Sequence, residues 1–369
     1  MSISYYPLSR LVARHQPALG QAVDDVVRSG QYLRGEREAA FEQAWSQAVG
    51  VAHTVGCANG LDALTLVLMG WKQREGWADG DEVIVPAMTF AATGLSVLRA
   101  GLRPVWCDVG ADALIDVADA KRRVTPRTRA AIAVHLYGRV CDVDALRAWQ
   151  KETGIKLLED AAQAHLARYQ GRPAGGLLDA AAFSFYPGKN LGALGDAGCV
   201  CTHDKDLATR VRALANYGAT EKYLHTFVGL NSRMDEIQAA VLTARLPYVE
   251  DENARRRSLA AQYRAKIHHP GVSLSPVASP DTDEVCHIFP VLVSQPADFQ
   301  HYMTTCGIET ARHYPRALHQ QTAFAHIDAP HLPVSERIAR EEVSLPIHPL
   351  LSDEEVVYIA ECINRYEAP

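Results

Sequence analysis

Short apolar runs alternate with amphipathic helical patterns along residues 50–215. Each run is rich in β-branched residues and apolar at consecutive positions, which is typical of strands buried on both faces of a parallel sheet. We predict strands in the segments EVIVPAM (from Glu82), RPVWCDV (from Arg103), AAIAVHLYG (from Ala130), KLLEDA (from Lys156), AAFSFYP (from Ala181) and GCVCTH (from Gly198).

Helical patterns lie between these runs and before them. The segments LDALTLVLMGWKQ (61–73) and VDALRAWQKETG (143–154) have apolar residues at helical spacing, and the second ends on a glycine as helix C-caps often do. Two further helices, Ala18–Ser29 and Glu36–Val49, are predicted before the sheet, separated by the turn GQYLRG. Strands joined by crossover helices predict an α/β fold with a mostly parallel sheet flanked by helices.

The pattern changes near residue 250. A long charged helical pattern, EDENARRRSLAAQYRAKI (250–267), is followed by a Pro-rich stretch with fewer strand signals. We therefore predict a large α/β domain over residues 1–250, which includes the N-terminal helices, and a smaller C-terminal α+β domain over residues 251–369. The sequence contains no internal repeat and no low-complexity segment.

Composition and charge exclude several classes of protein. The chain of 369 residues is 48% hydrophobic, which is enough for a large core. Lys and Arg number 37 against 43 Asp and Glu, so the net charge of -6 argues against nucleic acid as a partner. No apolar run is long enough to span a membrane and no secretion signal opens the sequence, so a cytoplasmic location is predicted. The 8 cysteines form no CxxC pair, and neither a disulfide framework nor a metal site is expected.

Polar residues follow two of the predicted strands. Asp160, Gln163 and His165 come at or after the end of KLLED, while Ser184 and Lys189 come at the end of AAFSFYPGK. In parallel sheets, ligands bind beyond the carboxyl ends of the strands. A buried carboxylate is costly unless it meets a cation or strong donors, so we expect a positive group beside Asp160. Lys189 could form a structural salt bridge there or be an ordinary solvated lysine.

The surroundings of Lys189 favour a pyridoxal phosphate site. PGKNLGALGDAG places this lysine in a glycine-rich turn, with Ser184 upstream and Asp160 at the end of an earlier strand. A lysine to form the Schiff base, a carboxylate to keep the pyridine nitrogen protonated, and hydroxyl and backbone donors for the phosphate are the groups that this cofactor requires.

Other motifs fit less well. A phosphate-binding P-loop would need a glycine where Phe183 stands and Ser or Thr where Asn190 stands. The glycines at 192, 195 and 198 lack the first close pair of a dinucleotide fingerprint, and neither a GxSxG elbow nor an HExxH helix is present.

At the level of whole motifs, the chain resembles the DegT/StrS family of pyridoxal phosphate-dependent nucleotide-sugar aminotransferases nearly end to end. The segments that carry the resemblance are SGQYLRGEREAAFEQAW, CANGLDAL, GDEVIVPAMTFAAT, VHLYGRVCDVDAL, LLEDAAQAH, FSFYPGKNLGALGDAG, NYGATEKYLHTFVGLNSRMDEIQAAVL and ERIAREEVSLPIHPLLSDEE. The resemblance implies a fold type I aminotransferase whose cofactor binds the larger domain. It also implies a homodimer with active sites at the subunit interface, and amino transfer from L-glutamate, giving 2-oxoglutarate, to a ketosugar nucleotide.

The resemblance assigns cofactor contacts residue by residue. Lys189 matches the Schiff-base lysine, Asp160 the partner of the pyridine nitrogen, and Gln163 the residue beside the phenolic oxygen. The remaining matches are the phosphate ligand Ser184, the backbone phosphate donors Gly60 and Leu61, the ring-stacking Phe90, and Asn231, which reaches the phosphate from the partner subunit. Many relatives have Thr in place of Leu61, so here the phosphate would rely on amides at a helix N-terminus.

The segment NYGATEKYLH is similar to that of relatives that aminate carbon three of dTDP-linked 3-keto-6-deoxyhexoses, although many have Ser in place of Ala219. The resemblance makes the following residues candidates for substrate contact: Tyr186, Tyr217, Lys222, Tyr223, His225, His313 and Tyr314. The alternative for each is a solvated loop residue. His165 either hydrogen-bonds Asp160, lines the sugar pocket or packs behind the site.

Two alternative functions stay open, and a third is disfavoured. One branch of the family, the dehydratases, has histidine in place of the lysine, and Lys189 disfavours it. The chain could aminate carbon four, or bind cofactor in a regulatory role without turnover. An aminated product would serve glycan synthesis, such as lipopolysaccharide O-antigen, or natural-product glycosylation. For Asn231, the alternative to a phosphate contact is that it or Ser232 caps the helix begun in GLNSRMDEIQAAVL.

Overall fold

The computed structural model describes residues 2–276 and 279–367. Its main sheet has seven strands in the order β1-β9-β8-β5-β4-β2-β3. All of the predicted strands are present, and β1, which was not predicted, forms the edge. The bounds are β1 (His53–Cys57), β2 (Glu82–Pro86), β3 (Arg103–Cys107), β4 (Thr128–Val134), β5 (Lys156–Asp160), β8 (Ala180–Ser184) and β9 (Gly198–Thr202).

One strand departs from the predicted parallel pattern. β9 pairs antiparallel with both of its neighbours, β8 and β1, while the other pairs in the sheet are parallel. The reason lies in the connection, because residues 185–197 contain no helix and return the chain directly beside β8. A short connection of this kind joins antiparallel strands, whereas a parallel pair needs a crossover. The prediction of a mostly parallel sheet is confirmed, and a parallel β9 is wrong.

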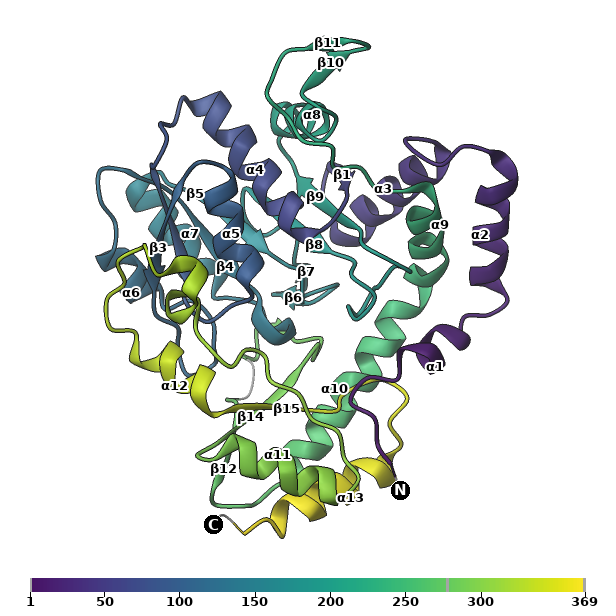
Figure 1. Ribbon diagram of the computed structural model, residues 1–369, viewed down its shortest axis with the longest axis vertical. Helices are drawn as coiled ribbons and strands as arrows, with labels where there is room; N and C mark the ends of the chain where they lie inside the picture. The colour runs from purple at the N-terminus through teal and green to yellow at the C-terminus, as the bar shows by residue number, and fades with distance from the viewer. Residues whose placement is uncertain (1, 277–278, 368–369) are drawn as a thin grey trace.

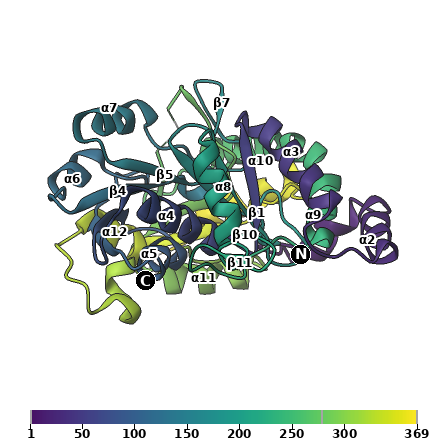
Figure 2. The same ribbon diagram turned by 90° about the horizontal axis from the view of Figure 1, so that it is seen from above.

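Helices cover both faces of the sheet, with α6 and α7 on one side and α4 and α5 on the other (Figure 2). Helices α2 and α3 coincide with the two predicted N-terminal helices and pack on α9. The bounds are α1 (Leu8–Ala13), α2 (Ala18–Ser29), α3 (Glu36–Val49), α4 (Gly60–Glu75), α5 (Ala91–Arg99), α6 (Val117–Arg122), α7 (Val143–Thr153), α8 (Lys205–Leu214) and α9 (Glu236–Arg245).

Small elements lie in the connections of this part. The hairpin β10–β11 projects beyond α8, at the top of Figure 1. Strand β13 pairs antiparallel with β6. This pairing brings a segment from the C-terminal part of the chain against the connection between β5 and β8. The bounds are η1 (Leu136–Gly138), β6 (Arg168–Tyr169), β7 (Arg172–Pro173), β10 (Ala219–Glu221), β11 (Leu224–His225), η2 (Leu246–Tyr248) and β13 (Thr282–Asp283).

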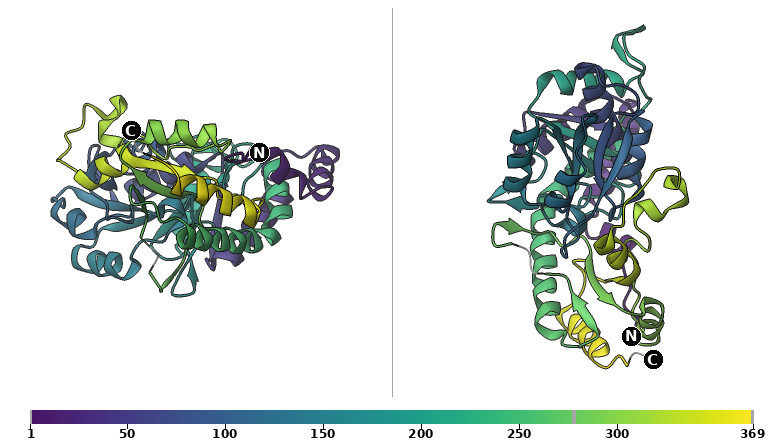
Figure 3. Two further views of the ribbon diagram at one scale, coloured as in Figure 1. Left: turned by 90° about the horizontal axis from the view of Figure 1, so that it is seen from below. Right: turned by 90° about the vertical axis from the view of Figure 1, so that its left-hand side faces the viewer.

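The long helix α10 (Val249–Lys266) leads from the main sheet to a second, antiparallel sheet of order β12-β14-β15 (Figures 1 and 3). This part of the chain has an apolar cluster of its own, formed by Ile3 and by buried side chains that lie between Leu259 and Tyr366 in the sequence. This mixture of helices and strands has the expected α+β character, while a division into domains at residue 250 stays a prediction. The bounds are β12 (Val272–Leu274), β14 (Phe289–Val293), α11 (Pro296–Thr305), η3 (Leu318–Gln320), η4 (Thr322–Phe324), α12 (Pro333–Glu341), β15 (Glu342–Leu345) and α13 (Asp353–Asn364).

The first residues of the chain lie against this second sheet. Ile3 forms a parallel bridge with Ile308, and Glu309 accepts hydrogen bonds of 2.9 Å from the Ser4 hydroxyl and the Tyr5 amide. The segment thereby places Tyr5 next to His313, with ring centroids 5.8 Å apart. Among the described residues, no helix is both long enough and apolar enough to cross a membrane.

Candidate active site

The residues predicted to carry chemistry meet at the carboxyl edge of the main sheet, where ligands bind in such folds. Asp160 is the last residue of β5 and Ser184 the last of β8, with Lys189 in the loop that follows. Phe90 is the N-cap of α5, in the segment that follows β2. Residues from the segments that follow three strands therefore lie at one edge of the sheet.

Asp160 is buried and held by two donors. Its Oδ2 accepts a hydrogen bond of 2.8 Å from the Thr93 hydroxyl, and its Oδ1 accepts one of 3.3 Å from the Ala162 amide. Burial raises the pKa of Asp160, while the bond from Thr93 and the charge of Lys189 oppose that shift. Within residues 2–276 and 279–367 this carboxylate forms no ion pair. The expected cation is Lys189, whose charge acts on Asp160 without a direct contact. The carboxylate thus keeps capacity for one further positive partner.

Lys189 lies in a loop that is anchored from behind. The next residue, Asn190, donates to Asn253 Oδ1 (2.8 Å) and to the Val285 carbonyl (3.0 Å), and its Oδ1 pairs with His287 Nδ1 (2.9 Å). Burial lowers the pKa of Lys189 from 10.5 to about 8, and the negative charge of Asp160 opposes the shift. The amine is consequently neutral for a substantial fraction of the time near pH 8, which suits a nucleophile.

This lowered pKa makes a prediction about attachment of an aldehyde to Lys189. We expect covalent capture of pyridoxal phosphate by the cofactor-free protein to accelerate with rising pH up to about 8 and then to level off, because only the neutral amine attacks. In Asp160→Asn the plateau should begin at lower pH, since the charge that raises the pKa is gone. Stopped-flow absorbance would measure both profiles. A rate that keeps rising towards pH 10 would show an unperturbed lysine.

The N-terminus of α4 lies next to Ser184. Asn59 caps the helix by accepting from the Asp62 amide at 2.8 Å. A Cβ on Gly60 would lie only 2.7 Å from Ser184 Cβ, so glycine is needed for this approach. Within the described part of the chain, the amides of Gly60 and Leu61 have no acceptor. Free amides at the positive end of a helix, beside a serine hydroxyl, are suited to a phosphate.

Gln163 links the sheet to the C-terminal part of the chain. Its Oε1 accepts from the Tyr137 amide at 2.6 Å, and its Nε2 donates to the Tyr314 hydroxyl at 3.0 Å. The Tyr314 ring in turn lies 5.3 Å from the ring of Phe90, which is half exposed. Gln163 is therefore fixed in one orientation, and Tyr314 links it to the ring of Phe90.

His165 does not bond to Asp160. Its ring is fully buried among Trp45, Phe183 and Phe185, and its Nε2 pairs with the Ser184 carbonyl at 2.9 Å. Burial lowers the pKa of His165 to about 3, with the charge of Lys189 adding to the effect. A side chain with no exposed surface in the chain cannot line a sugar pocket, so of the three alternatives the packed one holds.

The residues in and beside the hairpin β10–β11 that were predicted to contact substrate are exposed. The His225 Nδ1 pairs with the Tyr217 carbonyl at 3.0 Å, and Lys222 Nζ lies 5.3 Å from the ring centroid of Tyr223, which is 85% exposed. In the described ranges no hydrogen bond joins these four residues to Asp160, Gln163 or Lys189. Their contact with substrate stays a prediction, as does that of Tyr186, which is 58% exposed after β8.

The structure around Asn231 rules out the alternative that Asn231 or Ser232 caps a helix. Helix α9 begins at Glu236 behind Asp235, so neither Asn231 nor Ser232 is its cap. The Ser232 hydroxyl instead accepts from the Ala58 amide at 3.1 Å, two residues before Gly60. Asn231 itself is exposed and pairs through its backbone with Asn216. Its role toward a phosphate stays a prediction.

Sequence reasoning missed Thr93 and Tyr137. Thr93 is the strongest fixed donor to Asp160, and the spacing of Thr89 and Thr93 in PAMTFAATG, one helical turn apart, was the available signal. Tyr137 holds Gln163 through its backbone amide, which no side-chain pattern reveals.

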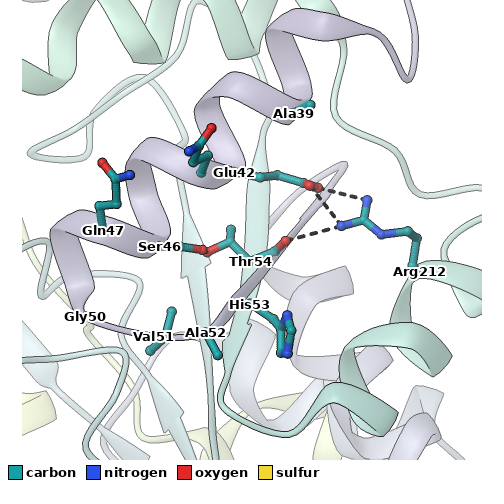
Figure 4. A pocket seen from close by; sticks show the side chains of 11 residues that line it. Ala39, Glu42, Ser46, Gln47, Gly50, Val51, Ala52, His53, Thr54 and Arg212 are labelled. Carbon is teal, nitrogen blue, oxygen red and sulfur yellow. Dashed lines mark hydrogen bonds and ion pairs between the residues drawn. The ribbon is translucent and has the colours of Figure 1, made fainter.

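One open cavity lies away from these residues. It has a volume of about 570 Å³ and lies between α3 and the edge strand β1, beside the Glu42–Arg212 ion pair (Figure 4). None of the predicted site residues lines it. The convergence of side chains at the sheet edge therefore marks the site.

Comparison with known proteins decides the class. The sequence matches the DegT/DnrJ/EryC1/StrS aminotransferase family over residues 15–364. The chain belongs to this family. A dTDP-3-amino-3,6-dideoxy-alpha-D-galactopyranose transaminase from Aneurinibacillus thermoaerophilus is 42% identical over 365 residues, 99% of each chain. A dTDP-3-amino-3,4,6-trideoxy-alpha-D-glucose transaminase from Streptomyces venezuelae is 43% identical over 94% of this chain and 91% of the relative.

The fold agrees with that of a solved family member. The crystal structure of S. venezuelae DesV in complex with a ketimine intermediate has a TM-score of 0.94 to this chain, with 41% identity and 98% of each chain covered. This confirms the predicted fold type I aminotransferase architecture.

The cofactor of the family, pyridoxal phosphate, fits the residues present. A lysine with lowered pKa, a buried carboxylate without an ion-pair partner in the described residues, and a glycine-lined helix N-terminus are the groups that it needs. The protein is thus a pyridoxal phosphate-dependent aminotransferase of the DegT/DnrJ/EryC1/StrS family.

Proposed function

We propose that the enzyme transfers an amino group from L-glutamate to carbon three of a dTDP-linked 3-keto-6-deoxyhexose. One observation carries the proposal: Lys189 and Asp160 lie at the sheet edge, near enough to shift each other's pKa, in a chain that is 42% identical over 99% of its length to a transaminase named for such a sugar. The segment NYGATEKYLH, similar to that of relatives acting at carbon three, supports the position.

Each residue of the site has a separate role in the proposed reaction. When bound, pyridoxal phosphate supplies an electron sink for the amino acid's Cα–H bond. Lys189 Nζ, neutral in part near pH 8, accepts and returns the Cα proton. Asp160 would hold a proton on the ring nitrogen of the bound cofactor, and the α4 amides with Ser184 Oγ would bind its phosphate.

Product identification tests this function. The enzyme is incubated with L-glutamate and one of three substrates: dTDP-3-keto-6-deoxygalactose, its glucose epimer, or a dTDP-4-keto-6-deoxyhexose. We expect 2-oxoglutarate and a sugar nucleotide with nitrogen on carbon three, located by NMR. Nitrogen on carbon four would favour a 4-aminotransferase. Consumption of no ketosugar, with cofactor bound, would favour a regulatory member.

We further propose that the active unit is a homodimer whose sites share residues from both chains. Asn231 is exposed, and Arg233 stands over the Tyr217 ring at 5.7 Å, in a segment next to the exposed hairpin β10–β11. Such a segment is placed to reach a second copy, and a two-fold pair is the commonest closed assembly.

A complementation experiment tests the shared site. A Lys189→Ala chain is mixed with an Asn231→Ala, Arg233→Ala chain under conditions that exchange subunits. If each site draws on both chains, one site in every heterodimer carries both lesions and the other none, so activity returns. Should each chain supply its own Asn231, every site keeps one lesion and mixing restores nothing. Mixing each variant with itself is the control.

A further inference from the structure

Asn190, the residue after Lys189, lies at the centre of a buried network of hydrogen bonds. Its Nδ2 donates to Asn253 Oδ1 on α10 at 2.8 Å, and Asn253 Nδ2 donates in turn to the His165 carbonyl at 2.9 Å. Asn190 Oδ1 pairs with His287 Nδ1 at 2.9 Å. Asn190 and Asn253 are 2% and 0% exposed. We call Asn190, Asn253 and His287 the Asn190 network, and the proposed function gives none of them a role.

Backbone carbonyls fix the direction of these hydrogen bonds. A carbonyl only accepts, so the atom of Asn190 that lies 3.0 Å from the Val285 carbonyl is the amide nitrogen, and the atom that faces His287 is the oxygen. His287 therefore donates from Nδ1. The His165 carbonyl fixes the amide of Asn253 in the same way. No carboxylate or hydroxyl takes part in these bonds, so none of the directions depends on the protonation of such a group.

These bonds hold both ends of the segment that contains Lys189. At one end, His165 Nε2 donates to the carbonyl of Ser184, the last residue of β8, at 2.9 Å. At the other end, Asn190 is bonded to α10 and to the segment that leads into β14. Between the two ends, the Lys189 amide donates to the Tyr186 carbonyl at 2.8 Å and closes a turn. The position of Lys189 relative to Ser184 therefore depends on this set of bonds.

The charge of Lys189 acts on the pKa of four groups: Asp160, His165, His287 and His313. Burial lowers the pKa of the three histidines and the charge of Lys189 lowers it further, so the three rings are neutral at pH 7. Burial is also the main cause of the lowered pKa of Lys189 itself. A loop that moved this amine into water would consequently return its pKa towards the ordinary value.

We propose that the Asn190 network positions Lys189: it keeps the amine buried near Asp160 and at a fixed distance from Ser184, the predicted phosphate ligand. This rests on the proposed role of Lys189 in binding the cofactor, but not on the identity of the sugar. Apolar side chains at the two asparagine positions would fill the space and leave the loop free to shift, because fully paired amides specify one arrangement. The alternative is that the network only stabilises the fold.

The test measures the reactivity of Lys189 in the cofactor-free protein. Each protein is labelled with a trace of acetic anhydride over a series of pH values, and peptide mass spectrometry gives the labelling of Lys189 relative to the exposed Lys205. Asn253→Leu removes both amide hydrogen bonds at nearly constant size. His287→Leu removes the donor to Asn190, whereas His287→Asn keeps an N–H group at the place of Nδ1.

Tyr263→Phe is the matched control. Tyr263 is a fully buried residue of the same helix, and its hydroxyl donates to the Pro346 carbonyl at 2.8 Å, a bond that does not involve the loop of Lys189. Its loss should lower the midpoint of thermal unfolding, as the loss of the Asn190 network should, but should leave the labelling profile of Lys189 unchanged.

We expect Lys189 to reach half-maximal labelling near pH 8 in the wild type, in Tyr263→Phe and in His287→Asn. In Asn253→Leu the profile should move to higher pH. Labelling at pH 8 should then fall by roughly fivefold, the change expected when the pKa of an amine rises by about one from the present value of about 8. In His287→Leu, which loses a single hydrogen bond, the decrease should be roughly two- to threefold.

Unchanged profiles in Asn253→Leu and His287→Leu would overturn the proposal. An equal shift in Tyr263→Phe would overturn it too, because it would indicate a general loosening of the fold, as would a shift in His287→Asn as large as that in His287→Leu. If Asn253→Leu does not fold, the two His287 variants decide. The labelling reports on Lys189 whether or not it binds cofactor, so a cofactor adduct in Lys189→Ala would count against the proposed role of Lys189 but not against the Asn190 network.

Discussion

Lys189→Ala is expected to lower amino transfer by roughly 10⁴-fold or more, the scale on which loss of a nucleophile and proton carrier acts. Neither Asp160 nor His165 could take over the Cα proton, because Asp160 would pair with the ring nitrogen and His165 is packed in the core. The variant should also bind pyridoxal phosphate only noncovalently. Borohydride reduction followed by mass spectrometry of the protein measures the attachment.

Lys205→Ala is the control for that experiment, since Lys205 is exposed at the start of α8 and should keep full activity. A borohydride-stable cofactor adduct in Lys189→Ala would mean that another lysine carries the cofactor.

Asp160→Asn keeps the shape of the side chain and removes its charge. We expect weaker cofactor binding and a half-reaction with glutamate that is slower by roughly 10²–10⁴-fold, because a buried charge left without its partner costs about 3–5 kcal/mol. Single-turnover absorbance measures this rate. The half-reaction slows because, without the charge of Asp160, the ring nitrogen no longer keeps its proton at neutral pH.

Thr93→Val supplies the graded comparison, since it leaves the Asp160 charge and removes one hydrogen bond of 2.8 Å. Its loss should be about tenfold. If Asp160→Asn and Thr93→Val slow the reaction equally, the carboxylate acts through local packing and not through its charge.

The elements that could be predicted are those with strong local signals. Helices α2 and α3 have regular patterns and end at glycines, Gly30 and Gly50, which adopt φ of 69° as left-handed C-caps. The edge strand β1 was missed because HTVGC is short and includes two polar residues and a glycine, so its period is not visible. The direction of β9 depends on the loop that carries Lys189, and a strand sequence does not encode its direction.

The site was predictable as a set of residues but not as a set of bonds. Asp160 and Lys189 follow strands, so their place at the sheet edge follows from topology. The bond from Thr93 spans 67 positions and requires the packing of α5 against the end of β5. Glu342 opens an apolar run and would be taken from sequence for an exposed strand end. The structure instead buries it, and its carboxylate accepts from the amide of His313, 29 residues away.

The packing of the N-terminal segment on the second sheet sets the order in which the newly made chain can be completed. Tyr5 leaves the ribosome roughly 300 residues before His313, which is about 15–60 s at ~5–20 residues per second. During that interval Ile3 cannot pair with Ile308, and Tyr5 cannot stack on His313. We infer that the main sheet assembles first during synthesis, and that the segment closes onto Ile308 and His313 only once the last helices have been translated.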